Sequence, residues 1–340
     1  MSKRKLNQQQ QNRIASKQAA VIDNPFDTEL LRGLVISHHG KEVEVLLVDS
    51  ADTPGSQASK RCHFRANLPT IVCGDRVLWR PLAQTNTGII EGLLTRDSLL
   101  QRPRPYQDPK PVAANIDTII ITLAAKPEPI SSLIDRFLIA AENAKLEVCL
   151  LLNKEDLLAD NPTVAAELEH LLALYSSLGY RIFRFSAQAS PTSLQQQEFI
   201  DFIADKNSIL VGQSGVGKSS IINVLAGSNT AKTAAISSAN DKGRHTTTTS
   251  QLYPLKENSI AGSGAIIDSP GIREFGLWHL SPEAIIEGLP EFRVHADLCK
   301  FRDCEHGKSH GCALQLAFEQ GKIHPSRMSS YHHILSSLDN

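Results

Sequence analysis

Apolar and polar residues alternate in short runs between residues 31 and 100, and glycine or proline separates the runs. The pattern predicts short strands at Leu31–Ser37, Val43–Val48, around Phe64, Asp75–Arg80 and Gly88–Leu94. Five strands in about 70 residues predict a small β-barrel, and an OB-type barrel is the commonest such unit that binds oligonucleotides. From periodicity alone, an SH3-like barrel or a β-module that binds no nucleic acid fits nearly as well.

The pattern changes after a Pro-rich segment, residues 101–111, which we expect to be an extended linker. Strand-like runs then alternate with helix-like runs, and this βαβ rhythm predicts a mostly parallel, doubly wound sheet. The expected strands are Ile116–Leu123, Glu147–Leu152, Arg181–Ser186, Ser208–Val211, Leu252–Leu255 and Gly264–Ile267. The expected helices are Ser131–Asn143, Pro162–Leu178, Gln195–Ala204 and one that begins at Lys218.

The ends of the chain differ from both patterns. Residues 1–24 are basic and Gln-rich with almost no large apolar side chains, so we expect a disordered arm that either has no role or touches RNA phosphates. The segment from Gly276 is helical in pattern and contains seven of the twelve histidines. We therefore divide the chain into an arm (1–24), a barrel (25–100), a linker (101–111), a sheet domain (112–275) and a C-terminal domain (276–340).

A phosphate-binding motif lies between an expected strand and an expected helix. The segment Gly212–Ser219 matches G-x-x-x-x-G-K-[ST] at every fixed position. The glycines let backbone N–H groups face the β-phosphate, and the helix N-terminus favours negative charge. We expect Lys218 to reach the β- and γ-phosphates and Ser219 to bind Mg²⁺. The predicted phosphate-binding residues are Gly212, Gln213, Ser214, Gly215, Val216, Gly217, Lys218, Ser219 and Ser220.

Two further motifs accompany the phosphate-binding motif. Asp268 and Gly271 follow a buried strand, where P-loop enzymes hold Mg²⁺ through water and sense the γ-phosphate. The segment Asn153–Asp156 ends an earlier strand, and a carboxylate there would accept hydrogen bonds from the N1–H and N2–H₂ groups of guanine. Asn153-Lys154-Glu155-Asp156 could otherwise be a simple helix cap. Ser186 and Ala187 follow the next strand, and a backbone N–H there suits guanine O6.

These motifs occur in reversed order, because the base-reading loops precede the phosphate-reading loops. The reversal need not damage a site, since all the loops leave the carboxyl ends of parallel strands, where such sheets bind ligands. Chain termini of compact domains are often close together, so a circular permutation can preserve the geometry.

Three of the six cysteines lie within residues 299–312. With a histidine, they form a Cys₃His set that suits one structural Zn²⁺. His295, His306 and His310 are all candidates for the fourth ligand. We expect Cys62, Cys73 and Cys149 to be core residues, because their neighbours are apolar and strand-like.

The chain resembles the circularly permuted, small-ribosomal-subunit-dependent GTPases of the RsgA (YjeQ) family. The matching segments are NKED at 153–156, SA at 186–187, GQSGVGKSS at 212–220, GRHTTTT at 243–249, DSPGIREF at 268–275 and the Cys/His cluster. The resemblance implies an N-terminal OB domain, a permuted GTPase domain and a C-terminal zinc domain, with Cys299, Cys304, His306 and Cys312 as the zinc ligands. It also implies a cytoplasmic GTP hydrolase that acts late in maturation of the 30S subunit, binds rRNA and releases an assembly factor.

The residue that orients the attacking water is not evident. Many GTPases place a glutamine after the D-x-x-G glycine, but the residue here is Ile272, so we expect slow intrinsic hydrolysis that the 30S subunit stimulates. His245, in the Thr-rich segment, is our candidate for the water-positioning group, although it could merely pack that loop. Thr247, or else Thr246 or Thr248, is expected to complete the Mg²⁺ shell when GTP is bound.

The total formal charge of −1 hides an asymmetry. Residues 1–112 carry 16 basic and 11 acidic side chains, whereas residues 113–275 carry 13 and 17, and residues 276–340 carry 6 and 8. The +5 of the first part is compatible with a limited RNA footprint, which the basic run Lys60–Arg65 on one strand also favours, although it could be an ordinary charged strand face. We expect a monomer in a reducing cytosol, and no apolar run is long enough to span a membrane. Two alternatives to a ribosome-dependent GTPase remain: a guanine-nucleotide-dependent RNA-binding module, and a P-loop enzyme that phosphorylates a small molecule.

Overall fold

The computed structural model describes two compact units, each considered separately below. Their limits along the chain are Met1–Leu100, Pro111–Asn115 and Thr248–Leu252 for the first unit, and Gln101–Lys110, Ile116–Thr247 and Tyr253–Asn340 for the second. The residues that the structure describes are 30–47, 59–83, 85–104, 107–159, 161–188, 193–227, 250–255, 264–268, 277, 280–301, 304, 306 and 311–338. The basic arm and most of the Thr-rich segment lie outside this set.

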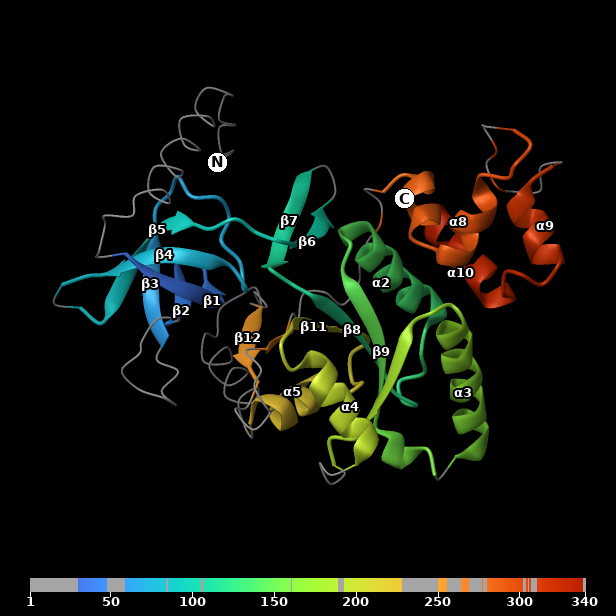
Figure 1. Ribbon diagram of the computed structural model, residues 1–340, viewed down its shortest axis with the longest axis horizontal. Coiled ribbons are helices and arrows are strands. Elements are labelled where there is room, and N and C mark those ends of the chain that lie inside the picture. Colours follow the sequence, from blue (N-terminus) through green and yellow to red (C-terminus); the bar gives the residue numbers. More distant parts are fainter. Residues whose placement is uncertain are drawn as a thin grey trace. The chain divides into compact units, whose positions relative to one another are not determined.

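Five strands of the first unit close into a barrel (Figure 1). The strands are β1 (Leu31–His39), β2 (Glu42–Leu47), β3 (Ser59–Phe64), β4 (Arg76–Pro81) and β5 (Thr87–Leu93). Neighbours pair in the order β1-β2-β3-β5-β4, and β4 pairs with β1 to complete the circle. All these pairs are antiparallel except β3 with β5. The barrel is therefore closed and OB-like. The alternating pattern predicted a small barrel, and the family resemblance implied the OB type.

The barrel core is filled by the inward-facing residues of the alternating pattern. Trp79 is 1% exposed and packs among the buried side chains of Val35, Val45 and Ile90. Gly88 makes room for the indole, because a Cβ at this position would lie 2.5 Å from a Trp79 ring atom. The glycine on β5 therefore serves close packing inside the barrel rather than a turn.

The described parts of the Pro-rich segment, residues 101–104 and 107–111, lie in two paired strands. β6 (Leu99–Arg104) and β7 (Gln107–Ala114) form a separate two-stranded sheet. Proline cannot donate a ladder hydrogen bond, so the number of prolines argued against strands here. A two-stranded ribbon tolerates proline, because the backbone N–H positions on the outer side of each strand form no hydrogen bonds within the sheet.

The second unit contains a parallel sheet with helices around it. Its strands are β8 (Thr118–Leu123), β9 (Glu147–Asn153), β10 (Arg181–Phe185), β11 (Asn207–Val211) and β13 (Ala265–Asp268). The boundary between the two units falls within β12 (Gln251–Pro254), which precedes β13. The spatial order is β10-β9-β8-β11-β13, with every pair parallel. These elements match the predicted strands to within two residues. All five carboxyl ends therefore lie along one edge of the sheet.

Helices cover the sheet as the βαβ rhythm predicts. They are α2 (Ser131–Ala144), α3 (Pro162–Ser177), α4 (Leu194–Ile203) and α5 (Lys218–Ala226), with a short 3₁₀ helix η1 (Glu155–Leu157) before α3. Phe199 of α4 and Ile221 of α5 share one buried cluster with alternate residues of the strands, such as Leu151 and Leu210. Cys62, Cys73 and Cys149 are all buried, which confirms their assignment to the cores.

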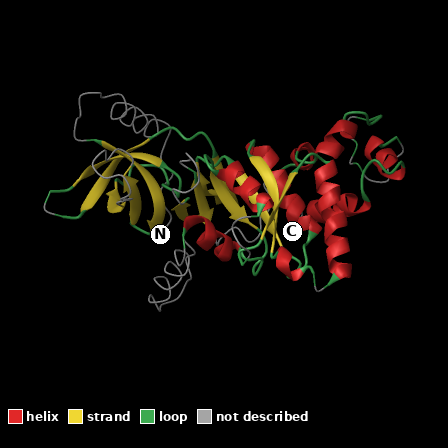
Figure 2. Cartoon of the chain, turned by 60° about the horizontal axis from the view of Figure 1, so that its bottom comes forward, coloured by secondary structure: helices red, strands yellow, loops and turns green. Residues whose placement is uncertain are grey.

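The described residues of the C-terminal segment form four helices: α7 (Pro282–Glu287), α8 (Pro290–Ala296), α9 (Ala313–Glu319) and α10 (Pro325–Ser336). Proline stands in the first turn of α7, α8 and α10, where no N–H is needed. Figure 2 shows that the described helices belong to the second unit, whereas the barrel is built from strands. None of the described helices is long and apolar enough to cross a membrane.

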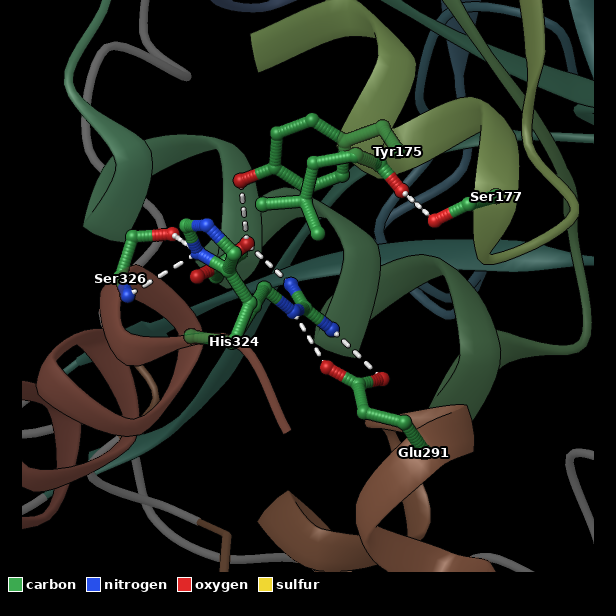
Figure 3. A network of polar contacts seen from close by, with 8 residues as sticks. Tyr175, Ser177, Glu291, His324 and Ser326 are labelled. Carbon is green, nitrogen blue, oxygen red and sulfur yellow. Dashed lines mark hydrogen bonds and ion pairs between the residues drawn. The ribbon is translucent and has the colours of Figure 1, made fainter. Parts of the chain in front are cut away.

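A buried polar network joins the C-terminal helices to the sheet domain (Figure 3). Arg327 of α10 donates from Nη1 to Asp135 of α2, and it donates to both Glu291 carboxylate oxygens on α8, at 2.6 and 3.1 Å. Tyr175 of α3 donates its hydroxyl to Asp135 at 2.7 Å. Four helices therefore meet at one charged cluster, which fixes the C-terminal helices against α2 and α3.

Candidate functional site

The phosphate-binding loop follows β11 and ends where α5 begins. Gly212, Gly215 and Gly217 all have positive φ angles, of 135°, 87° and 95°. Only glycine adopts such angles readily, so these three glycines allow the loop to take this shape. Lys218 donates from Nζ to the carbonyl oxygens of Gly212 and Gln213, each at 2.7 Å. The amine is therefore held over the loop, next to the N-terminus of α5.

Two groups that suit Mg²⁺ lie at the same edge of the sheet. Ser219 is exposed in the first turn of α5, and Asp268 is the last residue of β13. β11 and β13 pair so that Leu210 is opposite Asp268, which brings the carboxylate beside the phosphate loop. Burial raises the pKa of the Asp268 carboxyl, and the charge of Lys218 opposes this shift. A hydroxyl and a carboxylate oxygen are the hard ligands that Mg²⁺ prefers.

The loop after β9 is tied to the phosphate loop by two hydrogen bonds. Asn153 is buried and donates from Nδ2 to the carbonyl oxygen of Val216 at 2.8 Å. Lys154 donates from Nζ to the carbonyl oxygen of Gly215 at 2.6 Å. Its backbone is left-handed, with φ of 61°, which turns the chain directly into η1. The two loops are therefore held at a set distance from one another.

Asp156 and the loop after β10 form the other part of the site. Ser186 donates its hydroxyl to Asp156 Oδ1 at 2.5 Å. Asp156 is exposed, and Ala187 follows Ser186 at the end of β10. The register Phe185 opposite Asn153 explains why these loops meet, since both strands end at the same level of the sheet. The Asp156 carboxylate, which the Ser186 hydroxyl orients and which faces solvent, can accept hydrogen bonds from two neighbouring N–H groups of a base.

A second site lies among the C-terminal helices. The ligand atoms of Cys299, Cys304, His306 and Cys312 all lie within 4.8 Å of one another. Tetrahedral zinc with Zn–S bonds of about 2.3 Å separates its ligand atoms by about 3.8 Å, so this spacing fits zinc after a small contraction. Backbone N–H groups of Ala313 and Gln315 donate to the sulfur atoms of Cys299 and Cys312, which favours thiolates. Burial lowers the pKa of His306, which favours the neutral imidazole that binds metal.

The comparisons with known proteins agree with this geometry. A model of the RsgA GTPase family matches residues 93–278, which is more than half of the chain. The chain belongs to the RsgA GTPase family. Because the family is defined by GTP hydrolysis and the GTPase loops are present, the chain is a GTP-hydrolysing enzyme.

Individual relatives of this RsgA-family chain cover nearly its whole length. The small ribosomal subunit biogenesis GTPase RsgA of Marinobacter nauticus is 43% identical over 352 residues, covering 99% of this chain and 97% of the relative. The protein with the same description from Saccharophagus degradans is 43% identical over 350 residues, covering 100% and 98%. The crystal structure of YjeQ from Thermotoga maritima superposes with a TM-score of 0.68 at 30% identity, covering 92% of this chain and 99% of that chain. The crystal structure of YloQ, described as a circularly permuted GTPase, superposes with a TM-score of 0.65 at 24% identity, covering 93% of this chain and 97% of that chain. This likeness supports the fold.

Most of the predicted site residues of this RsgA-family GTPase are described and lie along one edge of the sheet. They are Asn153, Lys154, Glu155, Asp156, Ser186, Ala187, residues 212–220 and Asp268. Gly271, Ile272, His245, Thr246, Thr247 and Thr248 lie outside the described residues, as does the alternative zinc ligand His310. Among the described residues, the Cys/His cluster contains His306 and excludes His295.

The structure also places residues at the site that the sequence motifs did not indicate. The carbonyl oxygen of Lys126, in the segment after β8, accepts a hydrogen bond from Lys154 Nζ at 3.3 Å. Arg184 of β10 donates from Nη1 to Glu155 Oε1 at 2.9 Å. Backbone carbonyls carry no sequence signal, so the first contact was not predictable. An arginine two residues before Ser186 was visible, but nothing in the sequence indicated its partner.

Proposed function

We propose that GTP hydrolysis by this RsgA-family GTPase assists late maturation of the small ribosomal subunit. One observation supports the nucleotide-binding role above all: hydrogen bonds join the base-reading loop to the phosphate-reading loop. They run from Asn153 to the Val216 carbonyl and from Lys154 to the Gly215 carbonyl. One nucleotide can therefore be held at both ends in a set geometry. The relatives' printed name, small ribosomal subunit biogenesis GTPase, supports the ribosomal role.

In this proposal the loops divide the work on GTP. Asp156 accepts from guanine N1–H and N2–H₂, the Ala187 N–H meets guanine O6, and Asn153 braces the loop. The amides of residues 212–220 and Lys218 bind the phosphates, while Ser219, Asp268 and a threonine of 246–248 hold Mg²⁺, which neutralises charge on the phosphates when bound. Gly271 senses the γ-phosphate, and His245 orients the attacking water when the small ribosomal subunit is bound. Replacing His245 with alanine should then abolish ribosome stimulation, and unchanged stimulation would contradict its role.

Guanine specificity has its own test. Asn in place of Asp156 would present one donor and one acceptor to the base. It would therefore favour xanthine, which carries a carbonyl oxygen where guanine has N2–H₂. We expect Asp156→Asn to weaken GTP binding and to improve XTP binding. Unchanged preference for GTP would contradict the proposed base site.

We propose that the OB-like barrel, residues 25–100, contacts rRNA. Arg61 and His63 of β3, and Arg65 directly after it, have exposed side chains, at 72%, 51% and 54%. Glu42 and Glu91 lie beside them, so the net positive charge of this face is modest. Docking should therefore weaken with rising salt, but with a shallow slope that reports few phosphate contacts.

The remaining parts of the proposal concern the C-terminal domain and the assembly. Residues 276–340 would form a zinc domain that docks on the 30S subunit, with hydrolysis timing the release of an assembly factor from it. The protein would act as a cytoplasmic monomer. The decisive experiment compares GTP turnover with and without purified 30S subunits. Strong stimulation is expected, whereas unchanged turnover with nucleotide-dependent binding would favour an RNA-binding module in which hydrolysis is incidental.

A further inference from the structure

Arg184 bridges two elements beside the base-reading loops. Its guanidinium donates from Nη1 to Glu155 Oε1 on η1 at 2.9 Å. From Nη2 it donates to both carboxylate oxygens of Glu169 on α3, each at 2.7 Å. The Arg184 side chain is 25% exposed, so the cluster is partly shielded from water. Charge-assisted bonds of this kind are stronger and more directional than neutral ones.

The strand that carries Arg184 packs against α4 through Phe183 and Phe185, but it has a sheet neighbour on one side only. β10 is the edge strand of the described sheet and pairs only with β9. Its outer side opens into a cavity of about 320 Å³ whose lining includes Phe183, Arg184 and Glu169. The loop that contains Ser186 and Ala187 therefore follows a strand that has only one neighbour in the described sheet. Recognition of a base by hydrogen bonds needs its donors and acceptors fixed to within about half an ångström.

Arg184 and Ser186 act on consecutive residues of η1. Residues two apart on a strand point to the same side, and these two side chains bond Glu155 and Asp156 respectively. The pair of bonds sets both the distance and the rotation of η1 relative to the end of β10. Glu169 then anchors the arginine to α3, so the whole connection between η1, β10 and α3 is closed.

We propose that Arg184 is a positioning residue for guanine: by holding Glu155, it keeps the Asp156 carboxylate and the Ala187 N–H aimed at the same base. The proposal rests on the base-reading role proposed above for Asp156. It assigns Glu155 a partner within the protein rather than the nucleotide. A looser η1 weakens both hydrogen bonds of Asp156 to guanine, but only one to hypoxanthine, which lacks the N2 amino group. Loss of Arg184 should therefore narrow the preference for guanine over hypoxanthine.

The test compares equilibrium binding of GDP and IDP by calorimetry, with kcat for GTP as a second measurement. For Arg184→Met we expect GDP binding to weaken about fivefold, the IDP-to-GDP ratio of Kd values to narrow about threefold, and kcat at saturating GTP to stay within about twofold. Glu155→Met removes the acceptor and should reproduce the narrowed ratio, and it keeps the test possible if Arg184→Met does not fold. Combining both changes should add little to either, because they break the same link.

Two matched variants separate positioning from general stability. Glu169→Met breaks the tie to α3 but leaves the Arg184–Glu155 bond, so the ratio of Kd values should stay near the wild-type value although thermal stability falls. Arg181→Met alters the same strand away from the loops, where the guanidinium lies 5.2 Å from the centre of the Phe202 ring, and should leave the ratio unchanged. An unchanged ratio of Kd values in both Arg184→Met and Glu155→Met would overturn the inference. So would a narrowing of that ratio in Glu169→Met equal to that in Arg184→Met.

Failure of this inference can be distinguished from failure of the proposed base site. If Asp156→Asn shifts preference toward xanthine while Arg184→Met leaves the ratio unchanged, only the inference is wrong. If Asp156→Asn leaves the preference unchanged, the base site itself is wrong, and the inference falls with it.

Discussion

Arg327 and Asp135 are separated by 192 positions in the chain, yet they form an ion pair in which both side chains are only 1% exposed. Arginine is rarely buried unless paired, and here Glu291 shares the guanidinium while Tyr175 donates to the carboxylate. Breaking a buried pair from one side leaves an uncompensated charge, which costs more than the pair itself contributes. The joint between α10 and α2 is therefore sensitive to single substitutions.

Arg327→Met should destabilise the second unit, and more strongly at pH 8 than at pH 5. Burial raises the pKa of the Asp135 carboxyl above its ordinary value, and the Arg327 charge opposes this shift. Without Arg327, the pKa of Asp135 in the folded protein rises further. Folding then costs free energy at pH values above the unfolded-state pKa of Asp135, because the buried carboxyl must stay protonated or carry an unpaired charge. Below the unfolded-state pKa this cost is absent. We expect a loss of about 3–5 kcal/mol at pH 8 by urea unfolding.

The control for this prediction is Arg293→Met. Arg293 lies on α8 and forms an exposed contact of 3.9 Å with Glu142 of α2, so its loss should cost under about 1 kcal/mol at either pH. If Arg327→Met lowered the free energy of unfolding equally at pH 5 and pH 8, Asp135 could not be charged in the folded wild-type protein.

Gly217→Ala should weaken nucleotide binding far more than Gly215→Ala. Both residues have positive φ angles, so alanine is strained at each position. A Cβ on Gly217 would in addition lie 2.3 Å from Asn153 Nδ2, whereas a Cβ on Gly215 meets only Pro127 Cδ at 3.7 Å. We expect losses in GDP affinity of about 100-fold and about tenfold, respectively. Similar losses would show that Asn153 is not tied to the phosphate loop.

Arg96→Met should loosen the barrel without weakening nucleotide binding. Asp75 is fully buried and accepts two hydrogen bonds from Arg96, at 2.7 and 2.8 Å. Removing the arginine leaves a buried carboxylate, which costs about 3–5 kcal/mol. Hydrogen exchange should accelerate in peptides from β1 to β5, while the Kd of GDP stays constant. Arg76→Met removes an exposed pair with Asp97 and is the control, with little expected change. A raised Kd of GDP in Arg96→Met would contradict this separation.

The Cys/His cluster should hold one zinc ion per chain, measured by elemental analysis of the purified protein. His306→Ala and Cys304→Ser should lose the metal, since a structural site needs all four ligands. His295→Ala should keep it, because His295 lies outside the cluster. Loss of zinc from His295→Ala with retention in His306→Ala would reassign the fourth ligand.

Sequence patterns were sufficient for the fold class and for the loops that bind the nucleotide. The P-loop was recognisable because its fixed glycines, Gly212 and Gly217, stand where the loop needs positive φ angles. Strands such as β8, β9 and β11 were predicted because a buried parallel strand is a short apolar run, and the order of the motifs indicated the permutation. The Pro-rich segment 101–111 was harder, because its strand pairing depends on a neighbour rather than on its own composition.

Contacts between elements required the folded chain. Asn153 and Val216 are 63 positions apart, and Arg184 and Glu155 are 29 apart, and no periodicity relates such residues. Arg327 is ordinary in sequence, since an arginine usually indicates an exposed position, and only the convergence of α2, α3, α8 and α10 makes it a buried cross-link. Local backbone conformation and hydrophobic period are encoded in consecutive residues. The partner of a side chain depends on where distant elements pack, which is a property of the whole chain.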